Sequence, residues 1–156
     1  VLNELNVYPV PDGDTGSNMS MTISSVEKEL SKVNEKSSMN KVSEAVEEAI
    51  LMGARGNSGT ILSQIITGFL KGIGDKDRLY AADVVTALES AKEVAYKAVN
   101  QPVEGTILTV IRKVADSARE YVKTSDDLVG LLGNIKDTAQ EAVEQTPEEL
   151  PKLKEA

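Results

Sequence analysis

The sequence contains no cysteine, no histidine and no tryptophan among its 156 residues, and these absences remove whole classes of chemistry. Without cysteine there is no thiol nucleophile, no disulfide and no thiolate metal site, which fits a cytoplasmic protein. Without histidine there is no Ser-His-Asp triad, no imidazole base and no His-ligated zinc. Any bound metal must therefore be held by oxygen ligands, which favours Mg²⁺, Mn²⁺ or Ca²⁺.

Basic charge and aromatic side chains are also scarce. The 17 Lys and Arg are outnumbered by 25 Asp and Glu, for a net charge of −8, and four Tyr and one Phe are the only aromatic residues. Nucleic acid is not an expected partner, because nonspecific binding needs a basic surface and base stacking needs aromatics. Because ATP is an anion, this acidic protein could bind it only through a local positive group, such as a metal ion or a helix N-terminus. No apolar run reaches about 18 residues, so we expect no membrane span.

Apolar residues recur with helical spacing along most of the chain. Six amphipathic stripes predict helices, and they lie within residues 19–33, 42–50, 61–70, 84–95, 107–121 and 128–143. Thr146-Pro147-Glu148-Glu149 has the form of a capping box with Pro at the first helical position, which predicts one more short helix. No stretch alternates with the period of a strand. The sequence therefore predicts an all-α bundle, with one domain over residues 1–156.

Three segments interrupt the helical pattern, at residues 6–18, 53–59 and 100–106, and local rules tend to fail at functional sites. In the first segment Asp12 and Asp14 flank a glycine, so a sharp turn can bring both carboxylates to one hard cation. Thr15, Ser17 and Asn18 follow at a helix N-terminus, whose partial positive charge suits a phosphate. A plain turn with Ser17 or Asn18 as helix cap explains the same residues.

The second and third segments also have two interpretations each. Three glycines between Gly53 and Gly59 permit positive φ and close backbone approach. Asn57 and Ser58 lie where the next helix is expected to begin, so their N–H groups would face an anion. Alternatively the segment is a glycine-rich turn in which Gly59 allows close helix packing. In the third segment Thr106 lies near another helix start, where its hydroxyl would cap the helix or contact a ligand.

Three motifs occur in order within these segments. They are Asn6-Val7-Tyr8-Pro9-Val10-Pro11-Asp12-Gly13-Asp14-Thr15-Gly16-Ser17-Asn18-Met19, Ala54-Arg55-Gly56-Asn57-Ser58-Gly59-Thr60-Ile61-Leu62-Ser63-Gln64 and Pro102-Val103-Glu104-Gly105-Thr106-Ile107-Leu108. Together they resemble the signature of the kinase domain shared by dihydroxyacetone kinases and bacterial fatty acid kinase. The Pro-Val-Pro approach and the Arg-Gly-Asn-Ser-Gly form resemble the fatty acid kinase branch more closely.

The resemblance implies an antiparallel barrel of about eight helices with ATP and Mg²⁺ held by loops at one end. The helix that normally precedes Asn6 and the glycine-rich loop that normally follows Ala156 are missing from the sequence. We therefore expect a domain that lacks the first helix and is truncated at both ends. The C-terminal domain of the full kinase is missing as well, so the fragment alone is expected to be inactive or weak.

The resemblance also implies roles for individual residues. Asp12 and Asp14 would be the catalytic residues and would hold two Mg²⁺ ions that bridge the nucleotide phosphates. Asn6 takes the position of a third metal ligand that is usually acidic. Contacts to ATP or ADP would come from Thr15, Gly16, Ser17, Asn18, Met19, Gly56, Asn57, Ser58, Gly59 and Thr106.

The activity implied is phosphoryl transfer from ATP to a fatty acid, which yields an acyl phosphate for phospholipid metabolism. The fatty acid would be presented by a separate fatty-acid-binding (DegV-like) carrier protein. Two alternatives remain open: an ADP-binding subunit of a dihydroxyacetone or small-polyol kinase, and a nucleotide-binding module without catalytic activity. A homodimer is compatible with the sequence.

Overall fold

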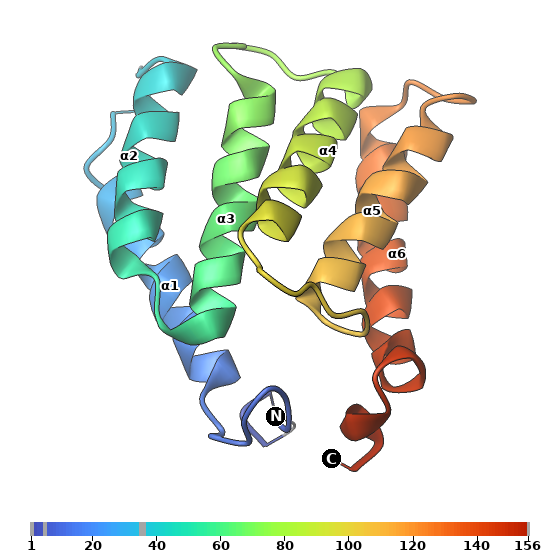
Figure 1. Cartoon of the computed structure of the whole chain (residues 1–156). Coiled ribbons are helices and arrows are strands. Elements are labelled where there is room, and N and C mark those ends of the chain that lie inside the picture. Colours follow the sequence, from blue (N-terminus) through green and yellow to red (C-terminus); the bar gives the residue numbers. More distant parts are fainter. Residues whose placement is uncertain (1, 5, 35–36, 156) are drawn as a thin grey trace.

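The computed structural model describes residues 2–4, 6–34 and 37–155, and this part of the chain is all-helical, as predicted (Figure 1). No strand and no helix long and apolar enough to cross a membrane occurs in these ranges. The elements are α1 (Thr15–Leu30), α2 (Met39–Gly53), α3 (Gly56–Ile73), α4 (Ala81–Lys97), α5 (Ile107–Tyr121), α6 (Leu128–Glu149) and the 3-10 helix η1 (Pro151–Glu155).

Consecutive helices run in opposite directions, which confirms the antiparallel arrangement (Figure 1). As a result, the starts of α1, α3 and α5 and the ends of α2, α4 and α6 lie together at the bottom of the view. Both chain termini lie at this end too. The three segments that interrupt the helical sequence pattern are therefore brought to one end of the bundle.

The main hydrophobic core lies between α4, α5 and α6, with partly buried side chains of α3 packed against it. Its buried members are Ala81, Val84, Leu88, Ala91, Ile111, Val114, Ala115, Ala118 and Leu131. Helix α3 packs more extensively against α4 than against any other helix. Glycines make this approach possible: a Cβ on Gly68 would lie 2.7 Å from Ala91 Cα, and one on Gly72 would lie 2.4 Å from Ala87 Cα. Any larger residue at either position would force the two helices apart.

Helix α1 is attached differently from what its apolar stripe predicts. The stripe from Met19 to Val33 predicts a buried face, but Ile23 and Leu30 are exposed, so the prediction is wrong for these two residues. The buried residues of α1 are instead the polar Asn18 and Thr22. Both lie against glycines of α3, where the lack of a side chain lets the helices come close. The close approach of α1 to the glycines of α3, rather than the hydrophobicity of its residues, determines which face of α1 is buried.

The separate short helix predicted at Thr146 does not form. Helix α6 continues through Pro147 to Glu149, and η1 follows. Pro147 has no N–H to donate to the Val143 carbonyl, and the Thr146 hydroxyl donates to that carbonyl instead, at 2.7 Å. Because the acceptor is satisfied locally, the helix passes through the proline and the capping-box prediction is wrong.

Candidate functional site

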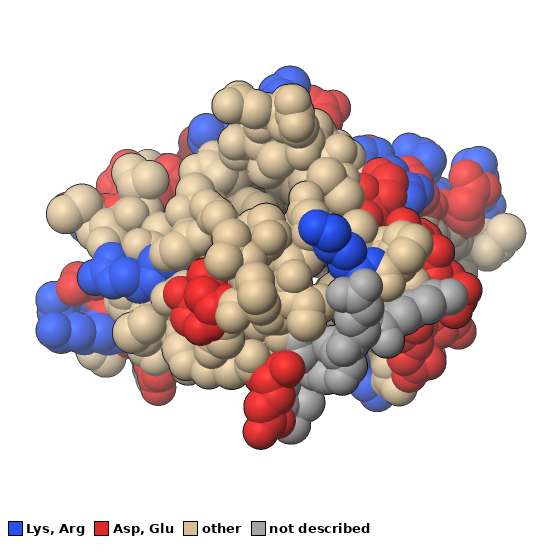
Figure 2. Space-filling view, turned by 60° about the horizontal axis from the view of Figure 1, so that its bottom comes forward, with Lys and Arg blue, Asp and Glu red and all other residues tan. Residues whose placement is uncertain are grey.

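A cavity of about 390 Å³ opens at the end of the bundle where α1, α3 and α5 begin. Its lining comes from all three interrupted segments and from Leu150 and Leu153 near the end of the chain. Figure 2 turns this end of the molecule forward and shows uncharged residues over most of its centre, with acidic and basic groups mainly around them. The volume is within the range of small-molecule sites.

Ten of the thirteen residues singled out from the sequence line this cavity. They are Asn6, Asp12, Asp14, Thr15, Asn18, Met19, Gly56, Asn57, Ser58 and Thr106. The other three lie elsewhere. Gly16 and Ser17 border a separate surface depression beside Asn3, and Gly59 is buried where α3 meets α1.

Two asparagines fix the segment that leads into α1. The Oδ1 atom of Asn6 accepts hydrogen bonds from the N–H and the hydroxyl of Thr15, at 3.0 and 2.6 Å, and the Asn6 amide donates to the Val10 carbonyl at 2.9 Å. Asn3 Oδ1 accepts from the Ser17 N–H at 3.0 Å, and its amide donates to the Ser17 hydroxyl at 2.7 Å. These bonds satisfy N–H groups that the first turn of a helix leaves without partners.

Helix α1 is therefore capped from upstream, and the prediction that Ser17 or Asn18 is its cap is wrong. The N-cap position belongs to Asp14, whose side chain makes no capping hydrogen bond. The carboxylates of Asp12 and Asp14 make no hydrogen bond or ion pair with any residue that the structure describes, and both residues line the cavity. Within the described ranges, no cluster of three or more acidic residues suited to a metal ion is present.

The second segment is joined to α1 through Thr22. The buried Thr22 hydroxyl donates to the Asn18 carbonyl at 2.7 Å and accepts from the Arg55 N–H at 3.2 Å. A Cβ on Gly59 would lie 2.4 Å from this hydroxyl oxygen, so Gly59 has the close-packing role that its sequence context offers as one interpretation. Gly56 has a φ of +59°, and a Cβ there would lie 2.4 Å from Asn18 Nδ2. Both positions require glycine.

Thr106 is the N-cap of α5, which confirms its predicted place at a helix start. Its hydroxyl accepts from the Leu108 N–H at 3.3 Å and donates to the Val103 carbonyl at 2.7 Å. The preceding Gly105 has a φ of +77°, and a Cβ on it would lie 2.5 Å from Leu150 Cβ. The third segment is thus in close contact with the end of α6 while Thr106 lines the cavity.

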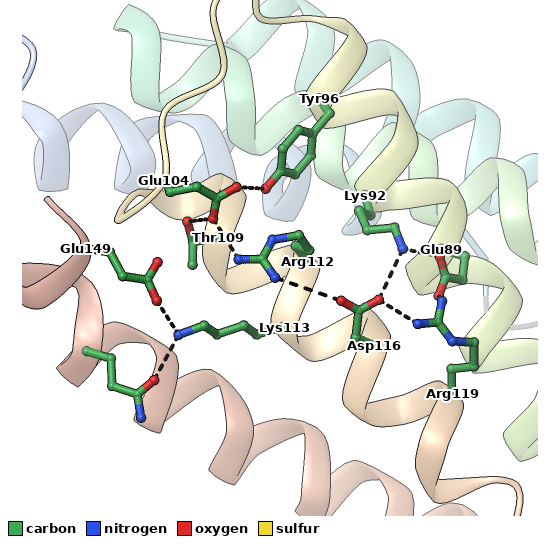
Figure 3. A network of polar contacts seen from close by, with 11 residues as sticks. Glu89, Lys92, Tyr96, Glu104, Thr109, Arg112, Lys113, Asp116, Arg119 and Glu149 are labelled. Carbon is green, nitrogen blue, oxygen red and sulfur yellow. Dashed lines mark hydrogen bonds and ion pairs between the residues drawn. The ribbon is translucent and has the colours of Figure 1, made fainter.

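The structure adds Glu104, which sequence reasoning did not single out. Its carboxylate accepts hydrogen bonds from the Tyr96 hydroxyl at 3.0 Å, the Thr109 hydroxyl at 2.6 Å and the Arg112 guanidinium at 2.7 Å (Figure 3). The bond from Arg112 contributes most to lowering the pKa of Glu104 to about 2; burial opposes the shift, and Thr109 and Tyr96 add to it. The one feature of the sequence that could have indicated this contact is an acidic residue, Glu104, placed just before a predicted helix that contains Arg112.

Sequence reasoning also missed the apolar part of the lining. It comes mainly from the first and third segments, the start of α5 and the end of the chain, and consists of Tyr8, Pro9, Val10, Ile61, Val99, Val103, Ile107, Leu108, Leu150 and Leu153. Most of the polar lining comes from the first and second segments. A cavity of this kind can bind a ligand that has both a polar or charged part and an apolar part.

Fold and site together define an all-helical domain with a loop-lined cavity at the end where three helix N-termini converge. The chain belongs to the DAK2 domain family, which matches residues 9–156. The family consists of kinase-type domains, which bind ADP or ATP in related kinases. The chain is therefore a kinase-type domain of a nucleotide-binding family.

Curated bacterial relatives are similar over almost the whole chain. An uncharacterized protein of Staphylococcus epidermidis is 43% identical over 155 residues, protein YloV of Bacillus subtilis is 43% identical over 154 residues, and an uncharacterized protein of Staphylococcus aureus is 42% identical over 155 residues. Each match covers 99% of this chain and 28% of the relative. The chain thus spans little more than a quarter of the length of these relatives.

Proposed function

We propose that the chain is the ATP- and Mg²⁺-binding domain of a fatty acid kinase. The observation that carries the proposal is one cavity that gathers the carboxylates of Asp12 and Asp14 with polar groups from the starts of three helices. Neither carboxylate has a hydrogen-bond or ion-pair partner among the described residues. Membership of the DAK2 family supports a nucleotide as the ligand. The sequence forms Pro-Val-Pro and Arg-Gly-Asn-Ser-Gly support the fatty acid kinase branch.

The donor chemistry of Asp12 and Asp14 fits Mg²⁺. Proteins usually hold this ion through one or two carboxylates, and water and phosphate oxygens complete its coordination. Bound Mg²⁺ would neutralise phosphate charge and orient the transferred group. We assign both ions implied by the resemblance to these two carboxylates. Asn6 can join them as a ligand only if its Oδ1 releases Thr15, because two hydrogen bonds already use that oxygen.

The phosphates would be held by the helix starts. Thr15 begins α1, Asn57 and Ser58 lie in the first turn of α3, and Thr106 caps α5, and all four line the cavity. The first N–H groups of a helix lack intrahelical partners and carry partial positive charge, so they attract anions. The N–H of Thr15 can take this role only if it releases Asn6 Oδ1, which it bonds at 3.0 Å. This local attraction would offset the net charge of −8, which otherwise disfavours ATP.

The acceptor in this proposal is a fatty carboxylate presented by a separate fatty-acid-binding (DegV-like) carrier protein. A carboxylate is already ionised at neutral pH, so its attack on the γ-phosphorus requires no general base from this chain. The products would be an acyl phosphate and ADP. A hydroxyl acceptor such as dihydroxyacetone would lose a proton during transfer, and a partner subunit would have to take it up.

Calorimetric titration with ATP tests the nucleotide site. Wild-type protein should bind ATP with Mg²⁺ and lose this binding in EDTA, and Asp12→Asn should lose it while its helical circular dichroism is unchanged. Asp77→Asn is the matched control, because Asp77 is an exposed aspartate between α3 and α4, at the opposite end of the bundle, and should bind like wild type. Equal binding by wild type and Asp12→Asn would refute the metal assignment. Absence of binding in wild type would refute the nucleotide site.

A second assay tests the acceptor. The kinase that contains this domain is incubated with ATP, Mg²⁺ and either a fatty-acid-loaded carrier protein or dihydroxyacetone. Acyl phosphate, trapped as a hydroxamate with hydroxylamine, is expected with the fatty acid. Phosphorylation of dihydroxyacetone alone would assign the chain to the small-polyol branch. Nucleotide binding without any transfer would indicate a non-catalytic module.

A further inference from the structure

The third segment of the cavity wall is tied to the helical core through one side chain. Val103 and Gly105 both line the cavity, whereas Glu104, which lies between them, does not. Its side chain points instead toward Tyr96 of α4 and toward Thr109 and Arg112 of α5 (Figure 3). Glu104 is thus linked through the backbone to two residues of the cavity lining, while its carboxylate lies at the interface between α4 and α5.

Thr109 connects this carboxylate to the backbone of the wall. Its side chain is fully buried. Its hydroxyl donates to Glu104 Oε2 at 2.6 Å and accepts from the Gly105 N–H at 2.8 Å. A hydroxyl has one hydrogen, and in Thr109 it points to the carboxylate. The lone pairs of the hydroxyl oxygen are therefore available to accept from the Gly105 N–H. The charge on Glu104 therefore determines how Thr109 holds the next peptide.

Gly105 is also restrained from its other side. Its φ of +77° and its closeness to the Leu150 backbone leave no room for a side chain: a Cβ would lie 2.8 Å from Leu150 N and 3.0 Å from the Thr146 carbonyl oxygen. The peptide at Gly105 is therefore held between Thr109 and the end of α6. The next residue is Thr106, the N-cap that lines the cavity.

We propose that Glu104 is a positioning residue of the nucleotide site, which acts through Thr109 on Gly105 and so fixes Thr106 against the ligand. The inference rests on the proposed function for the identity of the ligand. Arg112 and Tyr96 contribute by holding the carboxylate in the orientation that Thr109 requires. Loss of the carboxylate frees the third segment and weakens nucleotide binding, although Glu104 itself does not line the cavity.

Glu89 provides a matched control. It is also a glutamate that joins α4 to α5, through its ion pair with Arg119, and it pairs with Lys92 within α4. It lies in the part of the polar network remote from Glu104 (Figure 3). It does not line the cavity. Glu89→Ala should lower global stability, as Glu104→Ala should, without changing the third segment. Thr109 supplies a second pair of variants: Thr109→Val removes the hydroxyl at similar volume, and Thr109→Ser keeps it.

The experiment measures two quantities on the same proteins. Amide hydrogen exchange at Gly105 is measured without nucleotide, and the affinity for ADP with Mg²⁺ is measured by calorimetry. Glu104→Ala and Thr109→Val should each raise the exchange rate and weaken ADP binding by about tenfold, the scale of one lost charge-assisted hydrogen bond. Thr109→Ser should restore both quantities to near the wild-type values, and Glu89→Ala should change neither.

The outcomes separate this inference from the proposed function. Equal Gly105 exchange and equal ADP affinity in Glu104→Ala and Glu89→Ala would overturn the positioning role. If Glu104→Ala does not fold, the contrast between Thr109→Val and Thr109→Ser decides the question. Failure of the wild type to bind ADP would refute the proposed nucleotide function. The exchange rate at Gly105 would then still show whether Glu104 holds the third segment, because that measurement needs no ligand.

Discussion

The hydroxyl of Thr22 accepts a hydrogen bond from the backbone N–H of Arg55 at 3.2 Å, across a separation of 33 residues. The same hydroxyl donates to the Asn18 carbonyl at 2.7 Å. One buried side chain in α1 thereby holds the residue that precedes α3. Since Asn18 and Gly56 both line the cavity, this contact fixes the first two segments of the site relative to each other.

Thr22→Val should lower the free energy of unfolding by about 1–3 kcal/mol, because the Arg55 N–H loses the hydroxyl that it bonds and the buried side chain at position 22 then offers no acceptor. Urea denaturation followed by circular dichroism measures this change. Thr86→Val is the control, since the exposed Thr86 hydroxyl only donates to Ala82 within its own helix. Equal losses in the two variants would contradict the proposed importance of the contact.

Gly59→Ala should destabilise the protein, because the new methyl group would lie 2.4 Å from the Thr22 hydroxyl oxygen. Gly133→Ala, in α6, should instead stabilise it by about 0.5–1 kcal/mol, because alanine is the better helix former and a Cβ there meets nothing within 4 Å. The midpoints of urea denaturation should move in opposite directions. A shift of both midpoints to higher urea concentration would show that helix propensity, and not packing, controls the effect at Gly59.

The contribution of Glu104 to stability should depend on pH. Its pKa falls from 4.5 to about 2 in the folded protein, chiefly through Arg112. A depressed pKa means that the stabilisation is fully present above about pH 4.5 and is lost as the pH falls toward 2. The difference in unfolding free energy between wild type and Glu104→Gln should therefore be constant near neutral pH and shrink below pH 4.5. A difference that stays constant down to pH 3 would contradict the ionised, hydrogen-bonded carboxylate.

Asn57→Ala and Ser58→Ala should each weaken the binding of Mg²⁺·ATP by about 1–3 kcal/mol if each residue contacts a phosphate. Asn40→Ala is a matched control. Asn40, like Asn57, is the second residue of its helix, but it does not line the cavity and donates to Glu44. Calorimetry gives all three affinities. An unchanged affinity in both α3 variants would make their segment a packing element only.

The helices could be predicted from the sequence because apolar spacing and helix signals are local properties. Thr106 shows this well, as it is predicted at a helix start and caps one. The errors occur where a distant or unexpected partner decides. By itself Pro147 is typical of the first position of a new helix, but the Thr146 hydroxyl bonds the carbonyl that the proline leaves unpaired, and α6 continues through it. Ile23 belongs to an apolar stripe, yet the face of α1 that approaches the glycines of α3 is the one that is buried.

The candidate site could be predicted in part for similar reasons. Thr15, Asn18 and Met19 line the cavity, whereas Gly16 and Ser17 do not, although all five belong to one motif. Successive residues of a helix point about 100° apart, so Thr15 shares a face with the residues three and four positions on, Asn18 and Met19, and not with the next two. A sequence motif lists consecutive residues and does not show which of them face the cavity. Glu104 escaped notice because its partners come from two helices that only the fold brings together.

The cavity is lined by residues as far apart in the chain as Asn6 and Leu153. Most helix pairs that pack extensively are, by contrast, neighbours in sequence. Contacts of low sequence separation form early because they close short loops, and contacts between distant segments form late. We therefore expect the bundle to fold around its local pairs before the cavity takes shape. We also expect the native protein to open locally at the cavity, where distant segments meet, more readily than in the core between α4 and α5.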